Sequence, residues 1–178
     1  MPTSCAETPT KGLSVPFTFA NINDRSALVQ GETFFDLATV TNGAVSTDAM
    51  EAIQDSDLLH HYAAQLDDYE PSGIIAEADI CAPIPHPRNS FGVGLNYQLH
   101  VEEAASKTPS TPMVFTKFPS CISGPTDDVI MRSDECDYEG ELLVVIGKDG
   151  KDITKDEAWS YILGLSVGQD FSDRRVQY

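Results

Sequence analysis

The sequence predicts a mixed, β-rich fold in which a small α+β N-terminal domain, residues 1–82, precedes a β core over residues 83–178. Three observations support this prediction. Short apolar runs bounded by turn residues, which are typical of strands, recur along the chain. One longer segment, residues 47–66, instead has apolar residues at the three- and four-residue spacing of a helix face. Three prolines within residues 81–90 favour an extended connector, and we place the domain boundary there.

The N-terminal domain is expected to begin with a hairpin and continue into helix. Residues 26–40 read as two short strands around a turn at Gly31, with aromatic and aliphatic positions to bury. Residues 47–66 read as one helix or as two short ones, because Asp55 and Asp57 weaken the centre of the apolar face.

The second domain is expected to consist mainly of strands. A short helical turn over His100–Ala105 interrupts them, and the predicted strands are Phe91–Leu95, Met113–Lys117, Leu142–Ile146 and Leu165–Asp170. Leu142–Ile146 has the strongest strand pattern in the chain. Thr154 and Glu157 match a capping box, which predicts a short helix through Trp159, Ile162 and Leu163 that stops at Gly164.

Charge and composition limit the classes of partner. Eleven basic and 28 acidic residues give a net charge of −17, which repels nucleic acid and anionic membranes. No apolar run is long enough to span a bilayer, and the N-terminus lacks a basic start and an apolar signal core, so we expect a cytoplasmic protein. The four cysteines show no paired or C-x-x-C spacing and are interpreted as reduced thiols.

Two glutamates stand at the start of the strongest predicted strand. Side chains alternate along a strand, so Glu139 and Glu141 point the same way with Cβ atoms about 7 Å apart. They form either a solvated strand end or, with a third acid, a site for a hard cation such as Mg²⁺, Mn²⁺ or Ca²⁺. Asp170, at the end of another predicted strand, is the candidate third acid, and the alternative for it is an N-cap or turn aspartate.

Two further residues form a candidate acid–base pair. His100 and Glu103 are three positions apart, so on a helical turn the carboxylate can orient the imidazole or share a water with it. Lys117 follows a predicted strand and either presents its ammonium to a substrate or lies along the surface.

Four motifs together resemble the fumarylacetoacetate hydrolase superfamily. They are GVGLNYQLHVEE, PMVFTKFPS, DYEGELLVVIGK and AWSYILGLSVGQDFSDRRVQ, and the resemblance runs from about Phe91 to the C-terminus. It implies a fumarylacetoacetate hydrolase-type β core, and the chain is expected to stop before the C-terminal part of that core. The first 80 residues resemble the family's smaller N-terminal domain more loosely.

The resemblance also assigns roles to residues. It implies that Glu139, Glu141 and Asp170 bind Mg²⁺ or Mn²⁺, and that His100 with Glu103 activates water or handles a proton. It places Lys117 among the catalytic residues. It assigns Tyr97, Arg174 and Gln177 to substrate binding.

The function implied is a metal-dependent hydrolase that cleaves a C–C bond in a 2-oxo acid or 1,3-dicarbonyl compound. The alternatives are a lyase of the decarboxylase or hydratase type, or an isomerase, acting on a 2-oxo diacid through the same metal-held enolate. A second alternative is a truncated, non-catalytic binding or interaction protein. The expected partners are a small-molecule substrate and further copies of the chain, as a homodimer or larger oligomer.

Overall fold

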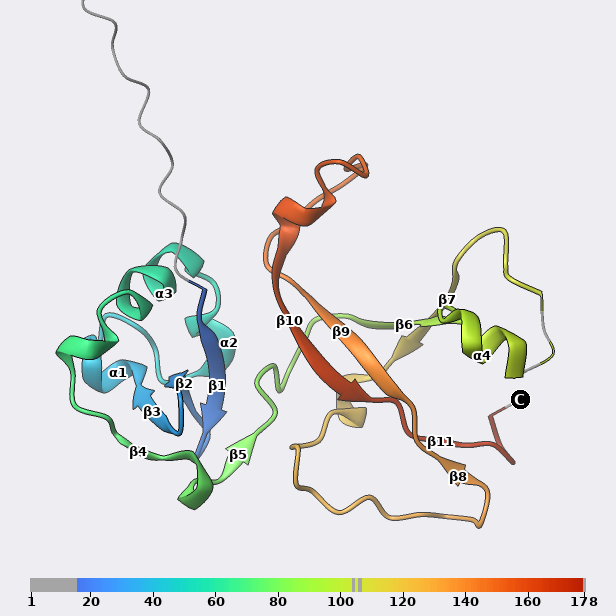
Figure 1. Cartoon of the computed structure of the whole chain (residues 1–178), viewed down its shortest axis with the longest axis horizontal. Coiled ribbons are helices and arrows are strands. Elements are labelled where there is room, and N and C mark those ends of the chain that lie inside the picture. Colours follow the sequence, from blue (N-terminus) through green and yellow to red (C-terminus); the bar gives the residue numbers. More distant parts are fainter. Residues whose placement is uncertain (1–15, 104, 106, 178) are drawn as a thin grey trace, which may run out of the picture.

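The structure, a computed structural model, describes residues 16–103, 105 and 107–177. Strands dominate it, as the sequence predicts, and helices are few and short (Figure 1). One five-stranded sheet and three two-stranded sheets account for the strands of the described residues. The five-stranded sheet lies at one side of the molecule in Figure 1, and the strands that follow β5 in sequence lie at the other.

The N-terminal sheet is antiparallel throughout and has the order β4-β3-β2-β1-β5. Its strands are β1 (Thr18–Ile22), β2 (Arg25–Gln30), β3 (Thr33–Asp36), β4 (Gly73–Ile74) and β5 (Ile80–Cys81). The predicted hairpin is confirmed as β2 and β3, and Gly31 in its turn has φ +62°, a conformation that glycine adopts without steric cost.

The predicted second strand does not extend to Val40. Residues Leu37–Val40 form the short helix α1. Asp36 causes this change, because its carboxylate accepts a hydrogen bond from the backbone N–H of Thr39 at 2.8 Å and so caps the helix. Strand β1 was not predicted from the sequence.

Residues 47–66 form two short helices, the second of the two predicted arrangements. They are α2 (Ala49–Ala52) and α3 (Ser56–Ala63). The break is local, since Asp55 accepts a hydrogen bond from the N–H of Leu58 at 3.0 Å and begins α3 anew. Two single 3₁₀ turns follow, at Leu66–Asp68 and Ile75–Glu77.

The hydrophobic core lies between this sheet and its helices. Its buried members are Leu28, Phe35, Leu37, Val45, Ala52, Leu59 and Leu66. None of the helices in the described part of the chain is long and apolar enough to cross a membrane. The cysteines described, Cys81, Cys121 and Cys136, are free thiols, and Cys5 lies outside the described residues.

The remaining strands form three antiparallel pairs. They are β6 (Ser90–Gly94) with β7 (Met113–Lys117), β8 (Cys136–Asp137) with β11 (Ser172–Asp173), and β9 (Gly140–Ile146) with β10 (Ile162–Gln169). These pairs confirm the predicted strands of the second half. Helix α4 (Gln98–Glu103) takes the place of the predicted turn over His100–Ala105, of which residue 104 lies outside the described residues. A 3₁₀ turn, Pro119–Cys121, follows β7.

The prediction of a helix after Thr154 is wrong, apart from its capping contact and one 3₁₀ turn. The capping contact is present, since the Glu157 carboxylate accepts from the Thr154 N–H at 3.1 Å. Only a 3₁₀ turn, Ala158–Tyr161, follows it, and β10 begins at Ile162. Pairing with β9 outweighs the local helix signal, and Gly164 lies opposite Val145 in the ladder instead of ending a helix.

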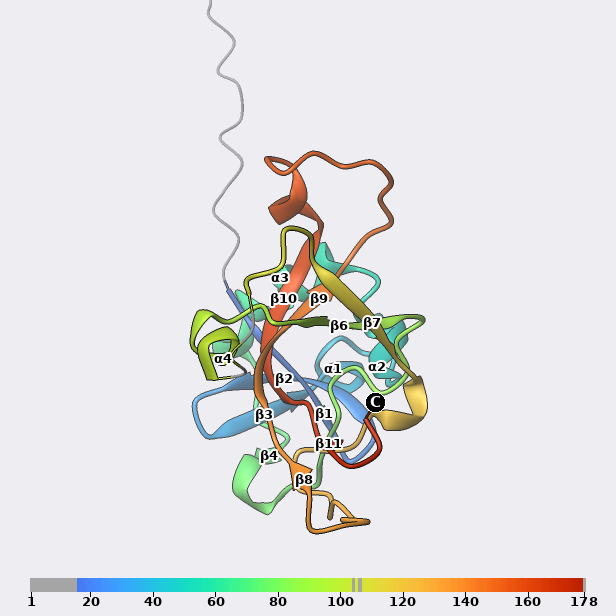
Figure 2. The ribbon, with the colours of Figure 1, turned by 90° about the vertical axis from the view of Figure 1, so that its right-hand side faces the viewer.

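The β9–β10 pair forms a long ribbon whose distal loop extends away from the rest of the molecule in both views (Figures 1 and 2). Its pairing places one set of aliphatic side chains on a single face, because residues directly opposite each other share a face. We call this set the aliphatic face, and it consists of Leu142, Val144, Leu165 and Val167. All four are exposed in the described structure.

Candidate functional site

The three predicted metal-binding acids lie on the other face of the β9–β10 ribbon. Glu141 pairs with Gly168, and the ladder continues one step beyond the strands, where the Asp170 N–H donates to the Glu139 carbonyl at 2.8 Å. Glu139 and Asp170 therefore stand directly opposite each other, and Glu141 is two residues along on the same face. Backbone pairing thus brings together residues that are 31 positions apart in the sequence (170 − 139).

Cationic side chains contact two of these acids. The Lys117 ammonium, at the end of β7, forms an ion pair with Asp170, and the Arg174 guanidinium forms one with Glu139. All four side chains are partly buried, with relative exposures between 19% and 31%. The two predicted cationic residues thus lie beside the predicted metal ligands.

Asp137 is a second carboxylate in contact with Arg174. Its carboxylate accepts from Nη2 of Arg174 at 2.8 Å and from Nε at 3.1 Å. The hydrogen bond from Arg174 holds the pKa of Asp137 below its usual value, and the contact with Asp137 raises the pKa of Arg174. Both groups are therefore charged near neutral pH.

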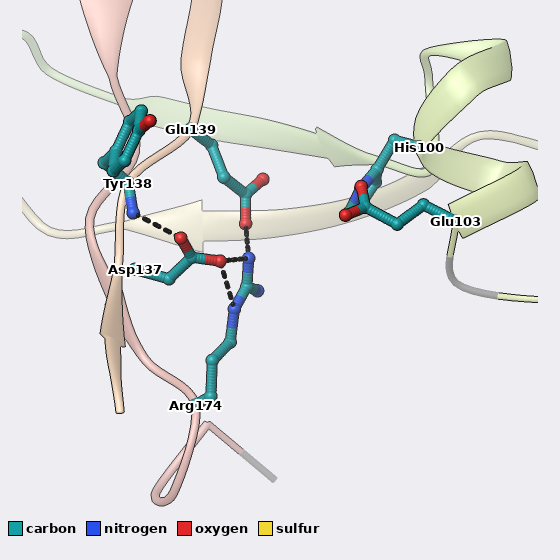
Figure 3. Close-up of a pocket in the computed structure, with 6 residues that line it drawn as sticks. All are labelled: His100, Glu103, Asp137, Tyr138, Glu139 and Arg174. Atoms are coloured by element: carbon teal, nitrogen blue, oxygen red, sulfur yellow. Dashed lines mark hydrogen bonds and ion pairs between the residues drawn. The ribbon is translucent and has the colours of Figure 1, made fainter. Parts of the chain in front are cut away.

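The predicted acid–base pair lies across a hollow from these residues. Val101 is buried, with 3% exposure, and so anchors α4, while His100 and Glu103 project side by side from the helix (Figure 3). His100 Nδ1 is 3.8 Å from Glu103 Oε2, which is within ion-pair range but longer than a hydrogen bond. The hollow has a volume of about 390 Å³, and its lining residues are His100, Glu103, Asp137, Tyr138, Glu139 and Arg174.

The other predicted site residues take different positions. Gln177 is next to the site, because its Oε1 accepts from Arg174 Nη1 at 3.0 Å. The Tyr97 hydroxyl accepts from the Leu142 N–H at 3.0 Å, which connects the α4 segment to β9. Within the described residues, the Glu141 carboxylate makes no hydrogen bond or ion pair, and neither Tyr97 nor Glu141 lines the hollow.

Sequence reasoning missed Asp137 and Tyr138 as lining residues. Both stand in the DYEGE motif directly before Glu139, and the signal that could have found Asp137 is its position two residues before Glu139, which gives the same strand face. Its role depends on Arg174, and that contact becomes visible only once β8 pairs with β11.

The donor set suits a hard divalent cation. Glu139, Glu141 and Asp170 offer only carboxylate oxygens on one face, which is the ligand chemistry of Mg²⁺ and Mn²⁺. Among the described residues, however, no three acidic, histidine or cysteine side chains gather closely enough to hold a metal ion. Asp170 contacts Lys117 and Glu139 contacts Arg174 instead. The backbone places the three acids on one face, and their assignment as metal ligands stays a prediction.

Comparison with known proteins identifies the family. A sequence model of the fumarylacetoacetate (FAA) hydrolase C-terminal family matches residues 89–178. The chain belongs to the fumarylacetoacetate hydrolase family. That segment contains every predicted site residue, and members similar to this chain include hydrolases, isomerases and oxaloacetate tautomerases.

Two curated relatives show how much of a whole family protein the chain covers. A homolog of fumarylacetoacetate hydrolase domain-containing protein 2 from Dictyostelium discoideum is 45% identical over 105 residues, which is 58% of this chain and 34% of the relative. The mitochondrial oxaloacetate tautomerase Fahd2a of Rattus norvegicus is 40% identical over 104 residues, 57% of this chain and 33% of the relative. The chain thus spans about a third of the length of these curated relatives.

Solved structures share the fold over most of this chain. A Mycobacterium smegmatis protein provisionally described as HpcE superposes with a TM-score of 0.78 and 35% identity, covering 89% of this chain and 56% of the other. Maleylpyruvate hydrolase from Sphingobium, solved with manganese(II) and pyruvate, superposes with a TM-score of 0.71 over 88% of this chain and 59% of its own. At 23% identity the second similarity shows the fold alone. Both comparisons confirm the predicted β-rich fold.

Proposed function

We propose that this chain supplies the cation-binding and proton-transfer residues of an enzyme that interconverts the keto and enol forms of a 2-oxo diacid. The observation that carries the proposal is that His100 and Glu103 face Glu139 and Arg174 across one hollow (Figure 3). The oxaloacetate tautomerases among the relatives, at about 40% identity, favour this reaction over the others in the family.

The cation would be Mg²⁺ or Mn²⁺, held by Glu139, Glu141 and Asp170, with Ca²⁺ as a further candidate. A bound divalent cation supplies Lewis-acid polarisation of carbonyl and carboxylate oxygens. The manganese in the Sphingobium hydrolase is consistent with this class of cation.

His100 acts as the proton carrier. A neutral imidazole removes a proton from the carbon next to the substrate carbonyl and returns it to the oxygen, which balances the keto–enol exchange. Glu103 lies 3.8 Å away, so it can orient the ring and stabilise its charged form while the proton is held.

Cationic side chains attract the diacid in spite of the chain's net charge of −17. Arg174 lines the hollow, and its positive charge attracts a substrate carboxylate. Gln177 is held beside Arg174. Lys117, at Asp170, adds a second positive charge near the predicted cation. Tyr97 accepts a hydrogen bond from the Leu142 N–H and lies outside the hollow, so its contact with the substrate stays a prediction.

Hydrolysis of a C–C bond in an acylpyruvate-like compound is the second candidate. A hollow of about 390 Å³ has room for a substrate larger than a four-carbon diacid together with a water. The same His100 would then take a proton from the attacking water, and cleavage would leave an enolate that is protonated on carbon.

Proton exchange separates these candidates from each other and from a non-catalytic protein. In D₂O with Mg²⁺, the chain should accelerate deuterium incorporation at the methylene carbon of oxaloacetate, followed by proton NMR. His100→Ala should lower this rate by about 10²- to 10⁴-fold. His86→Ala is the matched control, because His86 is exposed and lies outside this hollow.

Each outcome has a distinct meaning. Cleavage of acylpyruvates without exchange into oxaloacetate would favour the hydrolase. Exchange that falls equally in His100→Ala and His86→Ala would remove His100 from the mechanism. No exchange and no cleavage with either class of substrate would favour the non-catalytic alternative.

A further inference from the structure

Arg174 is held by more than the predicted metal ligand. Its Nε and Nη2 both donate to one carboxylate oxygen of Asp137, and its Nη1 donates to Gln177. Only Nη2 reaches Glu139. Three of its four side-chain hydrogen bonds therefore do not involve Glu139.

The Asp137 contact is fixed by the backbone on both sides. Asp137 pairs with Ser172 in the β8–β11 ladder, and the Arg174 N–H donates to the Glu135 carbonyl at 3.0 Å. These main-chain bonds set the separation of the carboxylate and the guanidinium. Because the contact uses both Nε and Nη2, it also fixes the direction of the guanidinium.

A cation at Glu139 would have two effects on Arg174. It would take the carboxylate that Nη2 contacts, and it would repel the guanidinium because both carry positive charge. Asp137 offers Arg174 a second carboxylate that is two residues away and is not among the predicted metal ligands. Without Asp137, Glu139 would be the one carboxylate among the described residues that contacts Arg174.

We infer that Asp137 is a positioning residue that retains Arg174 at the edge of the hollow when a divalent cation occupies Glu139. The inference rests on the metal site of the proposed function and adds a residue to it. Arg174 and the cation then occupy neighbouring carboxylates instead of competing for one. The guanidinium stays in place for an anionic substrate.

The competing interpretation is a simple surface ion pair. Asp137 is 47% exposed and Arg174 31% exposed, and exposed pairs contribute little to stability. In that case Asp137 would influence cation binding only through its negative charge, and its effect would not depend on Arg174.

A double-mutant cycle on the 178-residue chain distinguishes the two, with Mn²⁺ binding measured by the loss of the free-ion signal in electron paramagnetic resonance. Arg174→Met should tighten Mn²⁺ binding, since a competitor for Glu139 is removed. Asp137→Asn should weaken binding by about three- to ten-fold, because Arg174 is left on Glu139. In the Arg174→Met background, Asp137→Asn should change binding by less than about two-fold. Asp134→Asn, which removes a nearby exposed charge that makes no contact with Arg174, should also have little effect.

The outcomes separate this inference from the proposed function. If the unchanged chain binds no Mn²⁺, the metal site is wrong and the inference falls with it. If the chain binds Mn²⁺ but Asp137→Asn weakens binding equally with and without Arg174, the metal site stands and the inference is overturned.

A measurement on the unchanged chain avoids any folding defect in the variants. The Nε–H of Arg174 donates to Asp137 and not to Glu139, so its nitrogen–proton NMR signal should remain protected from exchange with water when Mg²⁺ is added. Loss of that protection on Mg²⁺ binding would show that Arg174 leaves Asp137 and would overturn the inference.

Discussion

The N-terminal sheet and the β9–β10 ribbon contain similar aliphatic residues, but the sheet buries them and the ribbon leaves them exposed. In the sheet, Leu28 and its neighbours are covered by short helices, and Leu28 has 0% exposure. In the ribbon, Leu142 is 60% exposed and Val167 is 82% exposed. Both regions consist of antiparallel strands with alternating side chains, so the difference lies in what covers them and not in strand chemistry.

This difference indicates what would stabilise the strands that carry the candidate site. Helices and a sheet bury a shared core, whereas a two-stranded ribbon needs another surface to cover its apolar face. The predicted metal ligands stand on the opposite face of that ribbon. Anything that covers the aliphatic face would therefore also stabilise the strands that carry Glu139, Glu141 and Asp170.

The largest expected effect tests the comparison directly. Leu28→Ala should lower the free energy of unfolding by about 3 to 4 kcal/mol, because it leaves a cavity in the core. Leu142→Ala makes the same chemical change on the exposed ribbon and should cost less than about 0.5 kcal/mol. Denaturant unfolding followed by circular dichroism, at protein concentrations low enough to keep the chain monomeric, measures both. Equal losses under these conditions would mean that Leu142 is covered within the monomer and that the contrast between the regions is wrong.

A smaller effect is expected at Asp36, which joins strand β3 to α1. Its carboxylate accepts from Arg25 and from the N–H and hydroxyl of Thr39. Asp36→Ala should therefore destabilise the N-terminal sheet by about 2 kcal/mol. Asp36→Asn keeps an oxygen that can cap the helix and should cost about half as much, since the Arg25 side chain is 46% exposed.

The same residue gives a pH dependence with a defined sign. The Arg25 hydrogen bond holds the pKa of Asp36 below its ordinary value. The stabilisation is therefore complete above about pH 4 and is lost as the pH falls through the lowered pKa. Acid unfolding should show this contribution in the unchanged chain and should not show it in Asp36→Asn. An unchanged acid transition in Asp36→Asn would show that the carboxylate does not contribute.

The N-terminal region shows which local signals could be read from the sequence. Gly31 marked the hairpin turn correctly, because a positive φ favours glycine. The strand after it was extended too far, since the apolar residues Phe34, Phe35 and Leu37 on both sides of Asp36 hide its capping role. Strand β1 was missed because Thr18–Ile22 becomes a strand through its pairing with β2 and β5.

The last expected effect concerns association. The homodimer or larger oligomer expected from the sequence would bury the aliphatic face if copies associate there, because four exposed aliphatic side chains side by side favour burial. Val167→Lys should then weaken self-association by about ten-fold, since it would bury a charge. Ser166→Lys points to the opposite face and is the matched control. Light scattering over a range of protein concentrations measures both, and equal behaviour of the two variants would place the contact elsewhere.

The candidate site residues could be identified from the sequence, but the contacts between them could not. The E-x-E spacing and the family motifs located the acids, and the spacing of His100 and Glu103 gave their common direction. The pairing of Asp170 opposite Glu139 depends on register across 31 residues (170 − 139), which local pattern does not encode. The helix predicted through Leu163 failed for the same reason, because β10 begins at Ile162 and pairs with β9.

The β9–β10 ladder is irregular near its distal loop and regular near Asp170, and this limits where family members can gain or lose residues. The register shifts between Ile162 and Gly164, and Leu163 lies over Gly147, where an added Cβ would come within 2.8 Å of the Leu163 Cβ. From Gly164 to Gln169 the pairing is regular and leads directly to Asp170. Residues inserted or deleted in the distal loop, 147–161, would not change the face of the ribbon on which Asp170 lies. One residue lost between Gly164 and Gln169 would turn Asp170 to the aliphatic face. Natural length variation should therefore be tolerated in the loop and selected against within β10.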